Sequence, residues 1–320
     1  MSYFVCRLAF FFLFYVLSTG AAAQVPVRAS YGSLGLSQVI LPLGVRSGIF
    51  QKNGLKIESV YIAGMSVSAL IGGDVQFGFM GGPPPILARL GGMDVVIIAG
   101  LNGLDQILVS APSIKKASDL IGKRVGISRF GTTADYGARI ALKRFKLQPQ
   151  KDVVLIQLGD TTARIGGILS GAVHAASLTG GEKEYALKLG FNILTDNADV
   201  EFPGNTVVTT RSYLNANREH VKRFVKGLVE VIHFVKAESE KTKGLLKKIY
   251  RQSDESIIGK RYEALVSLFP DYPYITRNAI QSFLDILWEE GKLKERTDSD
   301  MFMDMSFLRE VEEAERQRNR

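Results

Sequence analysis

The residues best suited to bind a ligand lie between Ser128 and Thr133, where hydroxyl side chains flank Gly131. Residues 123–142 predict a short apolar strand, a glycine-containing turn and a helix with Thr132 or Thr133 as its N-cap. Such a junction presents unpaired backbone N–H groups and the positive end of a helix dipole, which favour an anion or a polar ligand atom. An ordinary capped helix has the same pattern, so this stretch alone leaves both interpretations open.

Junctions of the same kind recur along the chain. Glycine, serine or threonine follows a predicted strand at five more places: Gly32-Ser33, Met65-Ser66, Gly81-Gly82, Thr161-Thr162 and Thr179-Gly180-Gly181. In open α/β sheets, the loops at the carboxyl ends of the strands surround the ligand crevice. Glycine lets a ligand approach the backbone, and hydroxyl groups supply neutral donors. Because no evident nucleophile or base accompanies them, the junctions indicate binding rather than catalysis.

The side chains required for metal binding or covalent catalysis are scarce. No pair among the three histidines has the spacing of metal ligands; His220 and His233 are expected in a helix, whereas His174, at the start of a strand, is a possible binding residue. The acidic residues within 196–201 are more typical of a polar loop than of a cation site. The chain has no P-loop, dinucleotide fingerprint or nucleophile elbow. We therefore expect no catalytic residue, no metal and no cofactor.

The N-terminus has the pattern of a secretory signal peptide. Arg7 precedes an apolar run at 8–17, and three alanines ending at Ala23 form a small-residue cleavage site, so we expect residues 1–23 to be removed. The run is short for a transmembrane helix, and an uncleaved N-terminal anchor is the alternative. The only cysteine, Cys6, precedes the run, which excludes a lipobox and leaves the mature chain without disulfides or cysteine nucleophiles.

Length and charge narrow the class of protein further. A chain of 320 residues is expected to form about two domains. The formal net charge is +8, and the positive residues are dispersed along the sequence. Since a secreted protein rarely meets nucleic acid, we expect no nucleic-acid partner, and the charge is compatible with an anionic ligand.

Strands and helices alternate along most of the chain. Strands are expected at 25–29, 55–62, 75–80 and 94–99, with helices at 38–50, 67–71 and 86–90 between them. The alternation returns with strands at 125–128, 153–158, 173–178 and 192–194 and helices at 114–120, 134–142, 163–169 and 182–189. This order predicts an α/β protein with parallel sheets.

Two extended segments, 104–112 and 202–209, are expected to connect two domains. The first domain would comprise 24–108 plus 206–320, and the second 109–205. From Tyr213 onward the pattern is helical, and the charged run 309–320 is expected to form a solvated, frayed helix. The loops of the two domains could then face each other across a cleft that closes by a hinge motion.

Several segments, in order along the chain, resemble one family. They are LPLGVRSGIFQKNGLKIE at 41–58, GGDVQF at 72–77, ASDLIGKRVG at 117–126, GAVHA at 171–175 and FVK at 224–226. Together they resemble the periplasmic substrate-binding proteins of nitrate, taurine and aliphatic-sulfonate ABC importers, a family shared with thiamine-pyrimidine precursor binders. The resemblance implies a type II periplasmic-binding-protein fold, with two α/β domains around a cleft and a helical C-terminal part.

In that family the ligand touches the loops after the first strands of each domain. The matching positions, and thus the ligand-binding residues that the resemblance implies, are Gly32, Ser33, Gly81, Gly82, Ser128, Gly131, Thr132 and Thr133. Arg129, beside the turn, is a further possible residue, with exposure to solvent as the alternative. The chain departs from the family at His174, where Asp is usual, and at Gly44 and Arg46, where an aromatic residue and Ala are usual. These departures leave the ligand open.

The resemblance implies an extracytoplasmic solute-binding component of an ABC importer. Such a protein captures a small ligand, here anionic or heteroaromatic, and delivers it to an inner-membrane permease with its ATPase. We expect a periplasmic monomer without enzymatic activity. The alternatives are a ligand-sensing partner of a membrane receptor, or an enzyme of the same fold that resembles pyrimidine-synthesising or menaquinone-pathway enzymes. The pyrimidine enzymes use a cysteine-rich motif, which the mature chain lacks.

Overall fold

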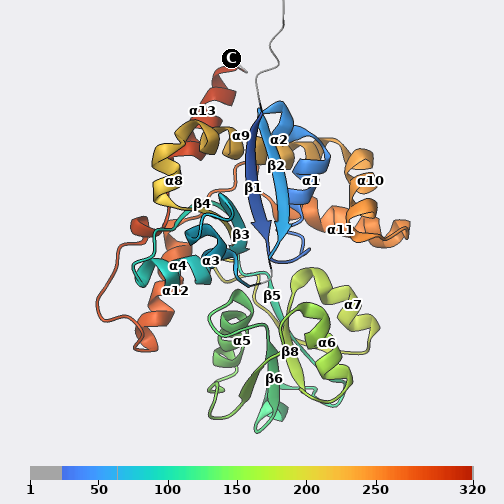
Figure 1. Ribbon diagram of the computed structural model, residues 1–320. Helices are drawn as coiled ribbons and strands as arrows, with labels where there is room; N and C mark the ends of the chain where they lie inside the picture. Colours follow the sequence, from blue (N-terminus) through green and yellow to red (C-terminus); the bar gives the residue numbers. More distant parts are fainter. Residues whose placement is uncertain (1–23, 63, 319–320) are drawn as a thin grey trace, which may run out of the picture.

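Two five-stranded sheets organise the computed structural model, which describes residues 24–62 and 64–318 (Figure 1). The predicted signal peptide lies outside the described residues. The first sheet has the order β2-β1-β3-β10-β4, with β1 Val25–Tyr31, β2 Leu55–Tyr61, β3 Phe77–Gly81, β4 Val96–Asn102 and β10 Asn205–Thr209. The second has the order β7-β6-β8-β5-β9, with β5 Gln106–Ser110, β6 Arg124–Ile127, β7 Val154–Gln157, β8 Ala175–Thr179 and β9 Asn192–Asp196. We call the elements built on these sheets the first and the second lobe.

The expectation of parallel sheets is wrong for one strand in each lobe. β10 runs antiparallel to β3 and β4, and β5 runs antiparallel to β8 and β9. Parallel neighbours need a crossover helix, whereas β5 and β10 arrive directly from the other lobe. The parallel strands of the first lobe point their carboxyl ends toward the second lobe (Figure 1). A strand that enters from that side must therefore run in the opposite direction.

Short helices connect the parallel strands of the first lobe. The single helix expected at 38–50 is divided into α1 Ile40–Arg46 and α2 Ile49–Lys52, because Gly48 adopts a left-handed conformation with φ 75°. The remaining two are α3 Ser66–Ile71 and α4 Pro83–Leu90. α4 begins at its prolines, which lack the N–H that would have no partner in a first turn.

Two helices cover opposite faces of the second sheet. α5 Thr133–Arg144 packs on the face that carries Leu108, Val125 and Ile127, and α6 Thr161–Leu169 packs on the face of Val109 and Ala176. This alternation follows from the two-residue period of strand side chains. The lobe also contains α7 Lys183–Lys188 and the 3₁₀ turns Ala117–Leu120 and Gly180–Glu182. The helix expected at 114–120 is therefore only the first of these turns.

The C-terminal helices belong to the first lobe (Figure 1). They are α8 Arg211–Ala216, α9 Arg218–Ala237, α10 Ser239–Tyr250, α11 Glu255–Leu268, α12 Arg277–Glu289 and α13 Ser306–Arg318, with a 3₁₀ turn at Ser299–Phe302. α13 covers most of the run 309–320, where a solvated helix was expected; within that run Val311 is buried against the first lobe, and Phe307 and Leu308, which precede it, are buried as well. None of the helices described here is long and apolar enough to span a membrane.

The stacked rings of Phe224 and Phe77 join α9 to the first sheet. Their centroids are 3.7 Å apart, and Phe50 of α2 stacks on Phe224 at 5.2 Å. All three side chains are buried. This aromatic stack holds the helical C-terminal part against β3, the strand that ends at Gly81.

We predict that Phe224→Ala lowers the free energy of unfolding by about 3–5 kcal/mol, because it leaves a cavity between α9 and the sheet. Phe224→Leu retains most of the buried volume and should lose less than half as much. Urea unfolding followed by circular dichroism measures both values. Equal losses for the two variants would contradict the role of the aromatic stack.

Candidate functional site

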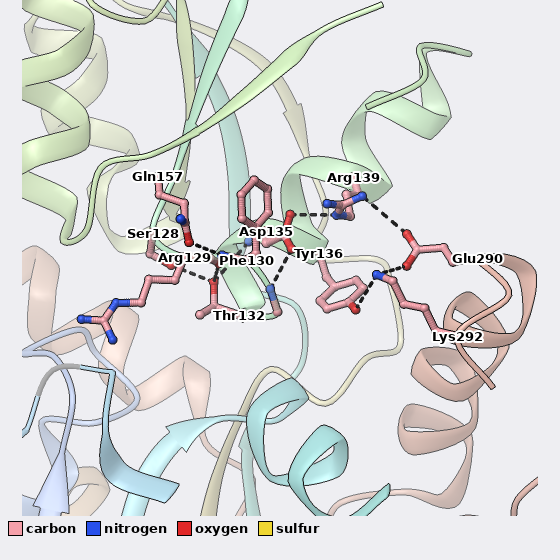
Figure 2. A network of polar contacts seen from close by, with 11 residues as sticks. Ser128, Arg129, Phe130, Thr132, Asp135, Tyr136, Arg139, Gln157, Glu290 and Lys292 are labelled. Carbon is pink, nitrogen blue, oxygen red and sulfur yellow. Dashed lines mark hydrogen bonds and ion pairs between the residues drawn. The ribbon is translucent and has the colours of Figure 1, made fainter. Parts of the chain in front are cut away.

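Thr132 organises the turn between β6 and α5. It is the N-cap of α5, as the sequence predicted, and its Oγ1 accepts from the N–H of Asp135 at 3.4 Å. The same hydroxyl donates to the carbonyl of Arg129 at 2.7 Å and lies 2.7 Å from Ser128 Oγ. Since the single proton of Thr132 is used on Arg129, Ser128 is the donor to Thr132. The two hydroxyls thus hold each other in place (Figure 2).

The turn itself is held by side chains from two other elements. The N–H of Gly131 donates to Asp135 Oδ2 at 2.8 Å, and the N–H of Phe130 donates to Gln157 Oε1 at 2.9 Å (Figure 2). Burial raises the pKa of Asp135, against the lowering effects of Gly131 and Arg139, which donates to its Oδ1 at 2.8 Å. Asp135 was not among the residues predicted from the sequence, although an acidic residue in a first helical turn is a known signal.

In the first lobe, Gln38 binds the loop after β1. The N–H groups of Gly32 and Ser33 both donate to Gln38 Oε1, at 2.7 and 3.1 Å. The amide nitrogen of Gln38 donates to Asn205 Oδ1 at 3.0 Å, so this buried side chain joins the ends of β1 and β10. In the sequence, Gln38 was expected only as the first residue of a helix; the signal for a further role is a polar residue before an otherwise apolar run.

Gly81 and Gly82 lie where the lobes touch. A Cβ atom on Gly81 would overlap Thr133 Oγ1 of the second lobe, and one on Gly82 would overlap the carbonyl of Pro203. Thr133 is buried, and its hydroxyl donates to the carbonyl of Gly204 at 3.1 Å. Gly81 therefore lets the N-terminus of α5 approach the first lobe, and Gly82 lets the crossing segment at Pro203 do so.

Arg129 reaches across to the first lobe. Its Nη1 donates to the carbonyl of Gly64 at 3.3 Å, and Gly64 has a φ of 72°, which favours glycine. Figure 2 shows the guanidinium directed away from Thr132 and Asp135. In this arrangement Arg129 connects the lobes beside the turn that contains Ser128.

The structure does not bring His174 to the other predicted residues. His174 precedes β8, and its Nδ1 accepts from the N–H of Arg124 at 3.4 Å at the start of β6. Because β6 and β8 are parallel, both residues lie at the amino edge of the sheet, opposite Ser128. Burial, with Lys123 and Arg124, lowers the pKa of His174. We therefore leave it out of the candidate site.

The acidic loop 196–201 is used in contacts between side chains. Asp199 accepts two hydrogen bonds of 2.8 Å from Arg144, which lower its pKa. Asp196 pairs with Lys183 at 3.3 Å, and Glu201 accepts from Thr276. Within residues 24–62 and 64–318, no group of three or more His, Cys, Asp or Glu residues could hold a metal ion.

A chain of polar contacts extends from the turn to the end of α12. Arg139, which binds Asp135, lies 3.7 Å from Glu290, and Glu290 pairs with Lys292 at 2.6 Å (Figure 2). Lys292 in turn donates to the Tyr136 hydroxyl at 3.5 Å. Asp135, which accepts the hydrogen bond from Gly131, is thus linked through Arg139 to Glu290 of the first lobe.

We predict that Gly81→Ala weakens the contact between the lobes, because its methyl group would overlap the Thr133 hydroxyl. A cost of about 1–3 kcal/mol is usual for such overpacking. Thr133→Ala removes the overlapping oxygen, so the double variant should recover most of the melting temperature lost by Gly81→Ala. Thermal unfolding measures this recovery, and additive losses would contradict the assigned contact.

Comparisons with known proteins agree with this fold. A taurine-binding periplasmic protein of Escherichia coli K12 is 30% identical over 173 residues, which are 51% of this chain and 52% of that protein. The chain thus spans about half the length of this curated relative. The alkanesulfonate-binding protein SsuA of Xanthomonas axonopodis pv. citri, bound to MOPS, has a TM-score of 0.72 at 19% identity and covers 89% of this chain and 100% of its own.

The nitrate-binding protein NrtA of Synechocystis PCC 6803 has a TM-score of 0.73 at 15% identity, over 91% of this chain and 89% of its own. These likenesses confirm the predicted periplasmic-binding-protein fold. Residues 41–241 match the family model described as NMT1/THI5 like. Because that match spans more than half of the sequence, the chain belongs to the NMT1/THI5-like family.

Proposed function

We propose that this protein is the extracytoplasmic solute-binding component of an ABC importer, and that it binds a small anionic solute between its lobes. The observation that carries the proposal is the meeting of strand-end loops from both sheets around the N-terminus of α5. The proposed ligand-binding residues are Gly32, Ser33, Gly81, Gly82, Ser128, Gly131, Thr132 and Thr133. Arg129 contributes a positive charge beside them.

The two connections between the sheets are suited to a hinge. A Cβ atom on Gly204 would overlap the carbonyl of Gly103, so the two crossing segments run in close contact. The N–H of Asn205 also donates to Asn102 Oδ1 at 3.1 Å. Two adjacent crossing segments allow the lobes to rotate about one line. In the proposal, 24–108 plus 206–320 form one moving domain and 109–205 the other.

The second lobe favours an anion. The first backbone N–H groups of α5 have no partner within the helix, and the helix dipole adds partial positive charge at the same place. Proteins similar to this chain are named for the binding of taurine, alkanesulfonate and nitrate, and this supports the same class of ligand here. A dissociation constant of ~1 μM requires only about −8 kcal/mol.

The remaining parts of the proposal concern the location of the protein, its partners and its lack of enzymatic activity. Cleavage after Ala23 would release the protein into the periplasm, where it would deliver its ligand, as a monomer, to an inner-membrane permease with its ATPase. We propose no enzymatic activity, because the relatives named above are binding proteins and no cysteine follows residue 23. Turnover of a sulfonate or sulfinate by the purified protein would overturn this part.

Thermal unfolding of residues 24–320 in the presence of taurine, ethanesulfonate or nitrate tests the function. A ligand at 100 times its dissociation constant should stabilise the protein by about 2.7 kcal/mol, because it binds only the folded state. Choline chloride is the cationic control and should give no shift. If a neutral heteroaromatic compound raises the melting temperature and none of the anions does, the proposed ligand class is wrong.

We predict that Thr132→Ala weakens binding of the stabilising anion at least tenfold, because the turn loses two hydrogen bonds that hold Ser128 and Arg129. Thr210→Ala is the matched control, since Thr210 caps α8 by the same type of bond to the N–H of Tyr213. Each variant should lose about 1 kcal/mol of stability with its cap. Calorimetric titration measures affinity, and equal affinities for the two variants would exclude Thr132 from the site.

A further inference from the structure

Tyr136 of the second lobe is buried in the hydrophobic core of the first. It belongs to α5, yet its side chain is 1% exposed and packs among the buried apolar residues of the first lobe. Its ring meets that of Phe283, on α12, edge to face, with the centroids 4.6 Å apart. The ring centroid of Phe202, in the second crossing segment, lies 6.5 Å from that of Tyr136 and 5.5 Å from that of Phe283. The three buried rings join α5, α12 and the crossing segment in one contact.

Polar contacts border these rings. Lys292, which follows α12, donates to the Tyr136 hydroxyl at 3.5 Å, and its Nζ lies 5.6 Å from the centre of the same ring. Lys143 of α5 forms an ion pair with Glu289 at the end of α12. Exposed ion pairs contribute little to stability, whereas buried aromatic side chains contribute much more. The rings are therefore the main attachment between α5 and α12.

The lobes meet differently on the side of α7 and α11, away from α12 (Figure 1). Lys260 of α11 lies 3.6 Å from Glu184 of α7, and both side chains are more than half exposed. Leu36 faces Gly181, where a Cβ atom would lie 3.2 Å from Leu36 Cδ1. Because Gly181 has no side chain, the second lobe buries little surface at this point. Contacts of this kind separate at low cost.

The position of the rings suits the axis of a hinge. Phe202 is close in sequence to Gly204, where the two crossing segments touch. In a rotation about these segments, atoms near the axis move least and atoms far from it move most. Separation of the lobes on the α12 side would expose three aromatic rings, each of which buries roughly 150–250 Å². The lobes can rotate with these rings in contact only if they part on the side of α7 and α11.

We propose that Tyr136, Phe202 and Phe283 form a fixed pivot, and that the cleft opens between α7 and α11 with the Lys260–Glu184 pair as its latch. We call the space between α7 and α11 the mouth. The inference rests on the proposed function only in that the solute enters through the mouth; the opening itself needs no ligand. A weak latch suits this role, since it biases the lobes toward contact and yields when they part.

Distances between pairs of spin labels test the proposal in residues 24–320, which contain no cysteine of their own. Lys188→Cys with Glu263→Cys spans the mouth, because these exposed residues lie on α7 and α11. Gln148→Cys with Lys294→Cys spans the lobes on the pivot side, because these exposed residues follow α5 and α12. Pulsed electron paramagnetic resonance measures both distance distributions in the absence of a ligand.

Glu184→Gln removes the charge of the latch and keeps its shape. It should raise the population with the longer mouth distance about two- to fivefold and leave the distance on the pivot side unchanged. Glu240→Gln is the matched control, because Glu240 pairs with Lys243 at 3.0 Å within α10 and should affect neither distance. Added salt should act on the wild-type protein as Glu184→Gln does, since it screens an exposed ion pair.

Substitutions in the pivot should act on the other pair of labels. Phe283→Ala should broaden the distribution on the pivot side, because it removes the ring that holds α5. Phe283→Leu keeps more of the buried volume and should give a smaller change, so it serves where Phe283→Ala does not fold. Tyr136→Phe retains the ring and should leave the distribution as in the wild type.

Equal changes of the two distances in Glu184→Gln would overturn the pivot, and an unchanged mouth distance in that variant would overturn the latch. Ethanesulfonate, taurine or nitrate should restore the shorter mouth distance in Glu184→Gln. If none of these anions alters a distance or the melting temperature, the proposed function fails. The response of the unliganded Glu184→Gln protein then still decides where the cleft opens.

Discussion

The way the two lobes face each other depends on the two segments that connect the sheets, because these segments run side by side. The close approach of Gly103 and Gly204 places the crossings side by side, and each crossing strand runs antiparallel in the sheet that it enters. All other strands then end toward the crossings. Both lobes consequently present their strand-end loops and helix N-termini to each other, which is where the α/β architecture binds its ligands.

Several polar groups of these loops are bonded within the protein. Gln38 occupies the N–H groups of the loop after β1, Asp135 occupies that of Gly131, and the Thr133 hydroxyl is bonded across the lobes. Buried donors without a partner are costly, so a structure with its lobes in contact must provide internal acceptors. In the proposed function, a ligand that enters between the lobes exchanges some of these bonds for its own, and binding is thereby coupled to lobe movement.

The two lobes differ in charge where they meet. The second lobe contributes the N-terminus of α5 and the guanidinium of Arg129, with the carboxylate of Asp135 behind the turn, whereas the first contributes the neutral amides of Gln38 and Asn205. In the proposed function, this asymmetry orients an anionic solute. The cavity of about 400 Å³ lined by Leu70, Met93 and Tyr213 lies on the first lobe at the other ends of its strands, and it is not part of this site.

The sequence by itself determined what depends on neighbouring residues. The strand and helix alternation, the N-cap Thr132, the proline start of α4 and the family resemblance all follow from local patterns, and the structure and comparisons confirm them. Only the tertiary structure decided the antiparallel strands β5 and β10, the burial of α13, and the separation of His174 from Ser128. It also decided the bonds from Gln38 to Asn205 and from Lys292 to Tyr136, which join residues more than 150 positions apart. Such contacts depend on how the elements pack, and no local propensity or spacing encodes them.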